Sequence, residues 1–491
     1  MPTSLSGKIA LNTLTSGGAR IISTAFALVS VGLITRTLGQ EGFGEYSTII
    51  AYLTLFVILA DLGLHSLMSR EISNKEDDTG KISSVFFTLR IISSIIFLGA
   101  GVVISLFFPY SNEVKIGMAI GALGMMFLSV SQLLLAIFQR YLSMEKAAIS
   151  EVLGRGAQLI IVYLIFIGQK DFFIEFISEP ELALYWFIIA MSVASFIIFA
   201  TQLIFSRKYI RLSLDFDTPK LIEILKEAWP IALSITLTLV YFKIDTIFLS
   251  IMKPAEHVGI YGVGYRVLES LIFFPSMFAG IMLPILSKQA KNIREFNSTL
   301  SRSIKAISIF AMPAVTGGMI LSYSIVNVIG GREFIVAGST MQILFIAIGL
   351  IFLGNIIGRA VIALDLQKKA VVVYLAGMVL NVVLNWIFIP KYTYIGAAWT
   401  TVFTEFMIVA LLFWLVRRKT GISINFFGIS KILLASIIMG ILLLWFVSPI
   451  NEPLPFIKLA AAMMLGGGSY FTALYLIKGV EPKEIASILS K

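Results

Sequence analysis

Long apolar stretches separated by short charged segments run through the whole of this 491-residue sequence. A helix needs about 20 mostly apolar residues to cross a bilayer. Fourteen stretches approach or exceed that length, at residues 9–38, 43–68, 82–108, 114–138, 147–167, 182–205, 228–252, 258–286, 304–329, 334–364, 370–389, 392–416, 432–447 and 454–477. The pattern predicts an all-α polytopic membrane protein with 14 transmembrane helices.

The composition excludes most soluble and catalytic classes. Apolar residues make up 58% and charged residues 13% of the chain, whereas soluble domains have roughly 45–50% and about 25%. Cysteine is absent and only two histidines occur, which argues against a thiolate site, a His-rich metal centre and a Ser-His-Asp site. No Walker A, HExxH or GxSxG motif is found. We therefore expect neither an enzyme nor a bound cofactor or metal.

The connections between the stretches differ in charge. Every second connection is rich in Lys and Arg, as in the run with Arg207, Lys208 and Arg211, whereas the alternate connections hold single cations such as Lys115 and Lys170. Positive charge collects on the cytoplasmic side of membrane proteins. We therefore expect both termini in the cytoplasm and a multi-pass location in the cell (inner, cytoplasmic) membrane.

Charged residues also occur inside the apolar stretches, where each costs at least about 2.5–3.5 kcal/mol if it faces lipid. Two interpretations remain open for them: interhelical salt bridges, or a surplus of cations lining a central cavity that attracts an anionic substrate. We favour the second for the set as a whole, and treat the acids as candidates for H⁺ or Na⁺ coupling. The cations are Arg20, Arg90, Arg155, Lys243, Arg266 and Arg359, and the acids are Asp61, Asp245, Glu269 and Glu405. Arg266 and Glu269 are three residues apart on one predicted helix, so they can pair.

Two weak internal echoes indicate a repeat. Glu41, Gly44 and Tyr46 recur with the same spacing as Glu256, Gly259 and Tyr261, and Glu145-Lys146-Ala147 resembles Lys368-Lys369-Ala370. Both echoes relate a predicted helix to the sixth one after it. An even number keeps the orientation, so the two halves form a parallel repeat about an axis along the membrane normal.

The repeat suggests a division into two six-helix lobes and an appendage. The predicted parts are an N-lobe at 1–210, a cytoplasmic interlobe linker helix at 211–227, a C-lobe at 228–420, and helices 13–14 with the C-terminal tail at 421–491. In the linker, Thr218-Pro219 is typical of a helix start. Leu221, Ile222 and Leu225 form an apolar stripe, so this helix either lies at the membrane interface or is an ordinary linker.

Short motifs spread over nearly the whole chain resemble those of one family. They are Arg36-Thr37-Leu38-Gly39, Gly42-Phe43-Gly44-Glu45-Tyr46, Asp61-Leu62-Gly63-Leu64, Arg70-Glu71, Trp229-Pro230, Lys243-Ile244-Asp245, Gly259-Ile260-Tyr261, Ile389-Pro390-Lys391-Tyr392 and Ile395-Gly396-Ala397-Ala398. The family is that of the oligosaccharide-lipid flippases, the Wzx-type polysaccharide biosynthesis and export proteins. It belongs to the superfamily that includes the MATE exporters and the lipid II flippases. The turn around Thr393-Tyr394 departs from the family's usual pattern.

The resemblance implies a fourteen-helix, two-lobed transporter. It would move a polyprenyl-pyrophosphate-linked oligosaccharide from the inner to the outer leaflet, with its lipid tail among the membrane lipids. An anionic pyrophosphate headgroup agrees with the cation surplus, because Arg binds phosphate oxygens through paired donors. Glycan polymerases and glycosyltransferases are candidate protein partners, and no nucleic acid partner is expected.

Two alternatives belong to other classes. A MATE-like antiporter for cationic drugs or metabolites would need an acid-lined cavity, for which four intramembrane acids are available. A membrane scaffold for glycan-assembly enzymes would need no transport, although the short outer connections offer partners little surface.

Overall fold

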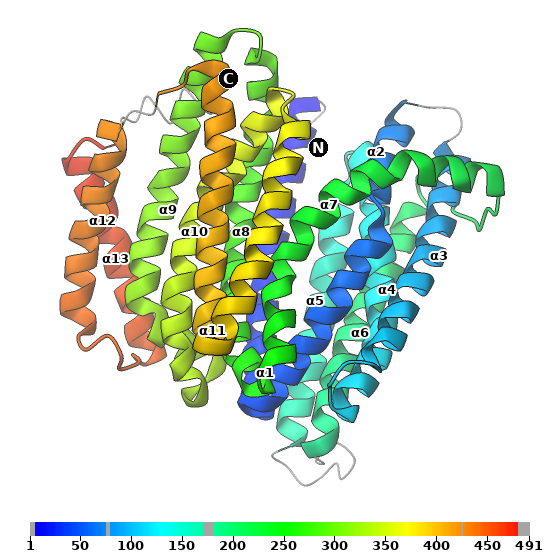
Figure 1. Ribbon diagram of the computed structural model, residues 1–491, viewed down its shortest axis with the longest axis horizontal. Coiled ribbons are helices and arrows are strands. Elements are labelled where there is room, and N and C mark those ends of the chain that lie inside the picture. The colour runs from blue at the N-terminus through cyan, green and yellow to red at the C-terminus, as the bar shows by residue number, and fades with distance from the viewer. Residues whose placement is uncertain (1–4, 75–78, 170–179, 424–425, 480–491) are drawn as a thin grey trace. The chain divides into compact units, whose positions relative to one another are not determined.

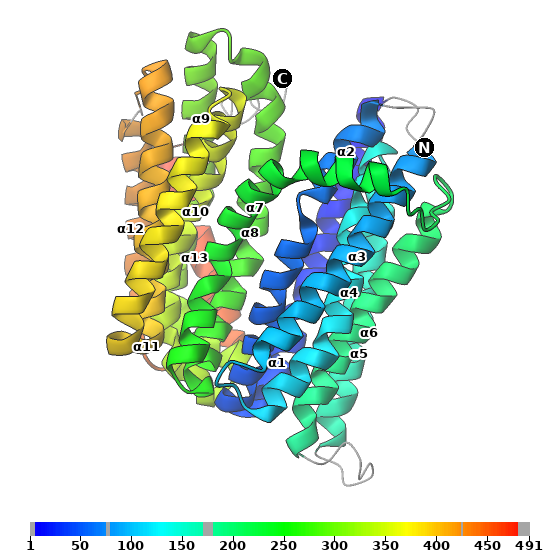
Figure 2. The same ribbon diagram turned by 45° about the vertical axis from the view of Figure 1, so that its right-hand side comes forward.

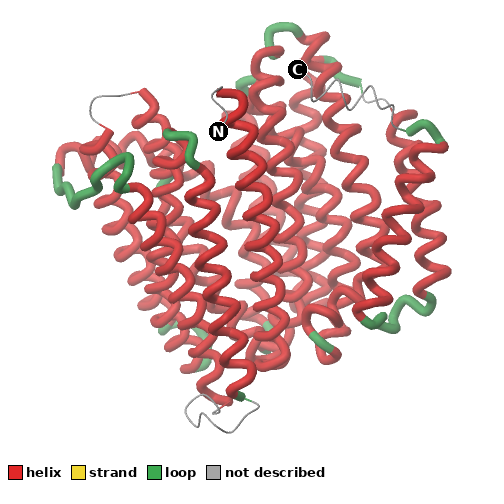
Figure 3. The backbone as a smooth tube through the Cα atoms, turned by 180° about the vertical axis from the view of Figure 1, so that it is seen from behind, coloured by secondary structure: helices red, strands yellow, loops and turns green. Residues whose placement is uncertain are grey.

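The computed structural model describes residues 5–74, 79–169, 180–423 and 426–479. Within these residues all regular structure is helical, with loops at the helix ends (Figure 3). Eleven of the described helices are long and apolar enough to cross a membrane. The α-helices are α1 (Leu5–Asp61), α2 (Leu64–Asn74), α3 (Thr79–Ser105), α4 (Asn112–Arg140), α5 (Met144–Gly168), α6 (Pro180–Ser206), α7 (Thr218–Met252), α8 (Ala255–Gln289), α9 (Ile293–Gly330), α10 (Ala337–Ala363), α11 (Gln367–Thr420), α12 (Phe426–Val447) and α13 (Phe456–Leu476), and a 3₁₀ helix (Arg332–Val336) precedes α10.

The chain divides into two compact units, Met1–Gly259 and Ile260–Lys491, here called unit 1 and unit 2. Unit 1 holds α1 to α7 and the first turn of α8, and unit 2 holds the rest. The prediction placed the helix after residue 228 in the second lobe, whereas α7 is grouped with unit 1. The reason is packing, since α7 contacts α1, α2 and α3.

Two of the long helices each contain one non-helical residue. In α1 this residue is Gly39, with φ 65° and ψ −169°, and in α11 it is Thr393, with φ 51° and ψ −131°. The apolar stretches placed the first connection at residues 39–42, and the break lies at Gly39, with residues 41–46 helical. They placed the second connection at residues 390–391, whereas the break lies at Thr393 and Pro390 is inside α11.

A break that the sequence analysis did not predict separates α1 from α2. The apolar stretch at 43–68 was expected to form one helix, but α1 ends at Asp61 and α2 begins at Leu64. Leu62 and Gly63 both have positive φ, 46° and 70°. Left-handed residues end a helix, and glycine adopts this conformation readily, so Gly63 is a local signal for the break. Leucine in this conformation is uncommon, so Leu62 gave no such signal.

The interlobe helix is part of α7 rather than a separate element. Helix α7 begins at Thr218, where the Asp217 side chain accepts a bond from the Lys220 amide and Pro219 occupies the first turn, as the motif predicted. In Figures 1 and 2 its first turns cross one end of unit 1 above α2 and α3, and the helix then turns alongside α1.

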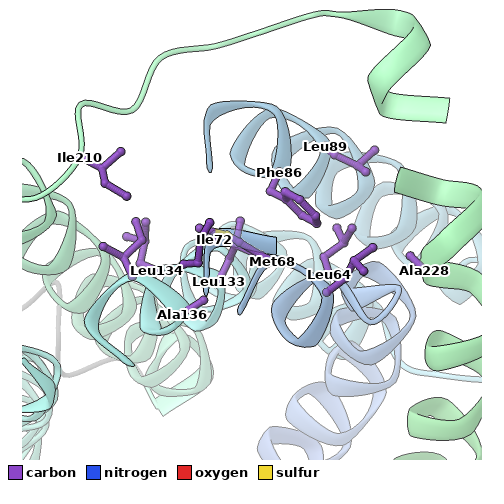
Figure 4. Close-up of a cluster of buried hydrophobic side chains, with 12 residues drawn as sticks. Leu64, Met68, Ile72, Phe86, Leu89, Leu133, Leu134, Ala136, Ile210 and Ala228 are labelled. Carbon is purple, nitrogen blue, oxygen red and sulfur yellow. The ribbon is translucent and has the colours of Figure 1, made fainter. Parts of the chain in front are cut away.

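Each unit has its own apolar packing. In unit 1, a cluster of buried side chains joins α2, α3 and α4 to Ile210, which precedes α7, and to Ala228 within α7 (Figure 4). In unit 2, α12 and α13 pack on α9 around Met439 and Tyr470. The Tyr470 hydroxyl donates to the Ile309 carbonyl at 2.8 Å, which ties α13 to α9.

Candidate functional site

Arg90 is the most buried of the predicted cations. Its side chain on α3 is 0% exposed, and its Nη1 atom lies 2.6 Å from Oδ1 of Asp61. Nε donates to the Ser129 carbonyl on α4 at 3.0 Å, and Nη2 is buried with no partner among the described residues. Because Asp61 is the last residue of α1, the ion pair links the helix break to α3 and α4.

Small polar side chains that the sequence analysis did not single out surround this pair. Ser93 donates to the carbonyl of Ala60 in the last turn of α1 at 2.8 Å, and Ser94 and Ser129 lie 2.8 Å apart. His65, in the first turn of α2, lies within electrostatic range of both Asp61 and Arg90. Serines are common in membrane helices, so only the three-dimensional contacts identify these as part of the site.

A second charged group joins α1 to α5 in unit 1. Arg20 Nη1 lies 2.5 Å from Glu151 Oε1, and the two side chains are 44% and 29% exposed. Arg155 is one turn further along α5 and donates to Gln158 at 3.0 Å. This group is more accessible than the Arg90 pair and lies on the part of α1 that precedes its Gly39 break.

The charges on α7 are also partly enclosed. Asp245 is 1% exposed and Lys243 is partly buried. Both side chains interact with neighbouring groups. They are two residues apart on one helix and therefore face different directions, as expected.

In unit 2, Arg266 and Glu269 of α8 form the predicted pair. Nη1 of Arg266 lies 3.1 Å from Oε2 of Glu269, and the side chains are 26% and 30% exposed. The pair lies along one helix, and Glu269 also interacts with a further group. Both side chains are more accessible than that of Arg90, which is 0% exposed.

Arg359 on α10 is held differently from the other cations. It is partly buried, and within the described ranges it forms neither an ion pair nor a hydrogen bond. Tyr374 lies within electrostatic range of both Arg359 and Glu405, and Glu405 is 4% exposed. These three residues bring a cation, a phenol and a buried acid to one region of unit 2.

Polar side chains also join the two halves of α11. Asn385 donates to Asn381 at 2.9 Å, and Asn381 donates to Thr404 at 3.4 Å. These bonds hold the helical segment before Thr393 against the one after it. In the part of the chain that the structure describes, no group of His, Cys, Asp or Glu is arranged to hold a metal ion.

The two glycines of the first sequence echo meet in unit 1. A Cβ atom on Gly44 would lie 1.8 Å from the Ala255 carbonyl oxygen, and one on Gly259 would lie 2.1 Å from the Gln40 carbonyl oxygen. Each glycine thus faces the residue four positions before the other. The contact is reciprocal, and the parallel repeat stays a prediction.

Comparison with known proteins gives the family. Residues 9–290, more than half of the chain, match the model of the family described as "Polysaccharide biosynthesis protein", and residues 230–387 match the MatE family. A "Putative O-antigen transporter" of Shigella flexneri is 23% identical over 415 residues, which cover 82% of this chain and 96% of that protein.

Two further similarities differ in extent. A "Probable low-salt glycan biosynthesis flippase Agl15" of Haloferax volcanii is 30% identical over 163 residues, 33% of this chain and 34% of that protein. The solved structure of the lipid II flippase MurJ in an inward closed conformation superposes with a TM-score of 0.73 at 18% identity. That superposition covers 95% of this chain and 98% of MurJ. At this identity the likeness establishes the fold.

Proposed function

Because the chain belongs to the family of polysaccharide biosynthesis proteins, we propose that it moves a lipid-linked oligosaccharide across the bilayer. The family is one of multi-pass membrane transporters of the cytoplasmic membrane, so the chain is not an enzyme. The cargo is a polyprenyl-pyrophosphate-linked oligosaccharide, and it passes from the cytoplasmic to the outer leaflet. The relatives named for O-antigen transport and glycan flipping support this cargo class.

The observation that carries the proposal is the set of six cations inside apolar stretches. A pyrophosphate needs donors in a low-dielectric site, and Arg supplies them in pairs. Arg359 and Arg266 of unit 2 are the first candidates for contact with the headgroup, because one has no ion-pair partner in the described chain and the other has only a partly exposed one. Arg20, Arg155 and Lys243 are candidates in unit 1.

Arg90 has a less direct role in this proposal. A guanidinium that is 0% exposed and bonded to Asp61 and Ser129 contacts cargo only after a rearrangement. Asp61, Asp245, Glu269 and Glu405 remain candidates for H⁺ or Na⁺ coupling, since each could change its protonation or ion occupancy during transport.

We also propose fourteen membrane spans and alternating access between two lobes. Two observations support the count: α1 and α11 each contain one sharp break, at Gly39 and Thr393, and α7 adds a span-length helix. The reciprocal contact of Gly44 and Gly259 supports the two-lobed arrangement, because such a contact can close one end of a two-fold repeat. The contact can then separate when the lobes rock.

The test compares substitutions in cells that depend on this protein for surface glycan. Arg359→Ala should reduce export and cause the lipid-linked oligosaccharide to accumulate on the inside, at normal membrane levels of the protein. If all six cation-to-Ala variants export normally at normal membrane levels, the cationic pathway is wrong.

The alternating-access step has its own test. Gly44→Ala and Gly259→Ala should each reduce export, because the added methyl group meets backbone atoms. Gly280→Ala is the control on α8, since its methyl group would meet nothing within 4 Å. Equal export by all three variants would contradict a closing role for the glycine contact.

The antiporter alternative makes the opposite prediction about charge. It requires that a cationic compound, rather than an anionic lipid, be exported on an imposed Na⁺ or H⁺ gradient. Transport of a fluorescent cation by the purified protein in proteoliposomes would favour it over the flippase.

A further inference from the structure

The chain between α6 and the spanning part of α7 leaves large apolar side chains uncovered. We call residues 207–228 the connector. Leu214, Phe216, Ile222 and Leu225 of the connector are 57%, 63%, 47% and 38% exposed. Many other exposed apolar side chains lie on helices long and apolar enough to span a membrane, but residues 207–227 precede the predicted span at 228–252. Something other than the core of unit 1 must cover these four residues.

Several contacts hold the connector against unit 1, so its exposed apolar side chains point in a defined direction. The Tyr209 ring stacks on Tyr141 with centroids 4.7 Å apart, and its hydroxyl lies 2.6 Å from Ser143 Oγ. The amide of Asp215 donates to Thr88 Oγ1 on α3 at 2.8 Å. Successive side chains of an extended segment alternate in direction, so Leu214 and Phe216 share one side.

The first turns of α7 have apolar residues on two sides. Leu221 and Ile224 pack against the buried cluster of unit 1. Ile222 and Leu225 are three residues apart, share a helix face, and are exposed. The apolar side chains of this helix therefore cover more of its circumference than the part that contacts unit 1. Such a distribution is typical of a helix that lies in a membrane interface.

Basic side chains precede the exposed apolar residues. Arg207, Lys208 and Arg211 are exposed and, within the described structure, form no ion pair or hydrogen bond. Lys146 is already engaged, since its Nζ lies 4.3 Å above the Tyr209 ring. Burial acts to raise the pKa of Tyr209, but its bonds with Lys146 and Ser143 outweigh burial and the pKa is lowered.

Two of the acidic side chains in the connector already have partners within the protein. Glu227 pairs with Arg70 of α2 at 2.7 Å, and Asp217 caps α7. The three cations at residues 207–211 are therefore available to an external anion. Each basic residue near an anionic membrane surface contributes about 1 kcal/mol.

We propose that the connector docks on the anionic headgroups of the adjacent lipid leaflet, with Leu214, Phe216, Ile222 and Leu225 inserted at the boundary with the acyl chains. The ligand is an anionic phospholipid surface. The bilayer is always present at the ends of the spanning helices, and it matches both the apolar side chains and the cations. The proposal does not depend on the cargo that the protein carries.

The absence of cysteine makes a site-specific test direct. Phe216→Cys, Ile222→Cys and, as a control, Glu223→Cys each carry one spin label, since Glu223 is exposed on the polar side of the same helix. Accessibility to oxygen and to a water-soluble nickel reagent is measured in nanodiscs. Nanodiscs expose both bilayer surfaces, so the result does not depend on the orientation of the protein.

Two lipid compositions separate the outcomes. In nanodiscs of phosphatidylcholine with phosphatidylglycerol, labels at residues 216 and 222 should become accessible to oxygen and protected from nickel, whereas the label at 223 stays in water. Phosphatidylcholine alone, or the combined Arg207→Gln, Lys208→Gln and Arg211→Gln variant, should reduce this protection.

Two results would overturn the proposal. The first is equal nickel accessibility at residues 216, 222 and 223 in the anionic nanodiscs, which places the connector in water. The second is low accessibility of 216 and 222 to both oxygen and nickel in the anionic nanodiscs, which indicates that protein covers them instead of lipid.

Discussion

Two ion pairs inside apolar stretches, one in each unit, have the same chemistry and different surroundings. The Arg90–Asp61 pair of unit 1 has an arginine that is 0% exposed and joins α1 to α3, with a further bond to α4. The Arg266–Glu269 pair of unit 2 lies along one helix, with side chains 26% and 30% exposed. Burial, rather than the type of residue, separates a charge that holds the fold from one that can exchange partners.

The energies that follow from this difference are unequal. Removal of one partner from a buried pair costs about 3–5 kcal/mol, because the other charge stays buried without compensation. An exposed pair contributes about 0–1 kcal/mol. The most buried cation of unit 1 therefore stabilises the packing of its helices, whereas Arg266 of unit 2 is partly exposed.

The largest expected effect is that of Asp61→Asn. It leaves Arg90 buried beside a neutral amide, so the free energy of unfolding should fall by about 3–5 kcal/mol. Reversible unfolding in mixed micelles measures this change. The double variant Asp61→Asn with Arg90→Met should recover much of the loss, because no charge remains buried. If the two single effects instead add in the double variant, the pair is not coupled.

Arg359→Ala should affect transport rather than stability. A hydrogen bond to a charged group contributes about 1.5–3 kcal/mol, so affinity for the pyrophosphate headgroup should fall at least about tenfold. Binding of a short-chain polyprenyl pyrophosphate to the purified protein measures this. Arg359→Lys keeps the charge without the paired donors, so its affinity should lie between those of the unchanged protein and of Arg359→Ala. A fall in the free energy of unfolding as large as that caused by Asp61→Asn would mean that Arg359 stabilises the fold, as Arg90 does.

Arg20→Gln should have a smaller effect on stability. The Arg20–Glu151 pair joins α1 to α5, but its side chains are 44% and 29% exposed. We expect a loss of about 1 kcal/mol or less, measured as a coupling energy with Glu151→Gln in a double-mutant cycle. A coupling energy of several kcal/mol would mean that exposure does not predict the strength of these pairs.

The coupling between Arg266 and Glu269 should be the smallest effect. Pairs three residues apart on one helix contribute about 0.2–0.5 kcal/mol, so a double-mutant cycle of Arg266→Gln and Glu269→Gln should give a coupling energy of about that size. The same micelle unfolding experiment checks it, with Asp61→Asn measured alongside. A coupling energy as large as the loss caused by Asp61→Asn would remove the distinction between the two units.

Features that depend on a few neighbouring residues were predictable. The apolar stretches indicated an all-helical membrane protein, since length and hydropathy are properties of a continuous segment. The start of α7 at Thr218-Pro219 and the pairing of Arg266 with Glu269 were predicted because helix geometry places those atoms together. The repeat inferred from the similarity of the segments around Gly44 and Gly259 stays a prediction.

Features that depend on distant contacts were not predictable. Leucine favours helices, so the positive φ of Leu62 could not be predicted, although Gly63 beside it is a residue that often ends helices. The partner of Arg90 comes from 29 positions earlier in the chain, and its carbonyl acceptor from 39 positions later. Spacing along a sequence says nothing about pairs at such separations.

The sequence by itself determined that the chain is helical, lies in a membrane and carries more cations than acids in its apolar stretches. Only the tertiary structure decided which cations are neutralised, because a charge is paired or available according to which helices pack beside it. That packing also grouped α7 with α1 and left one side of the connector uncovered.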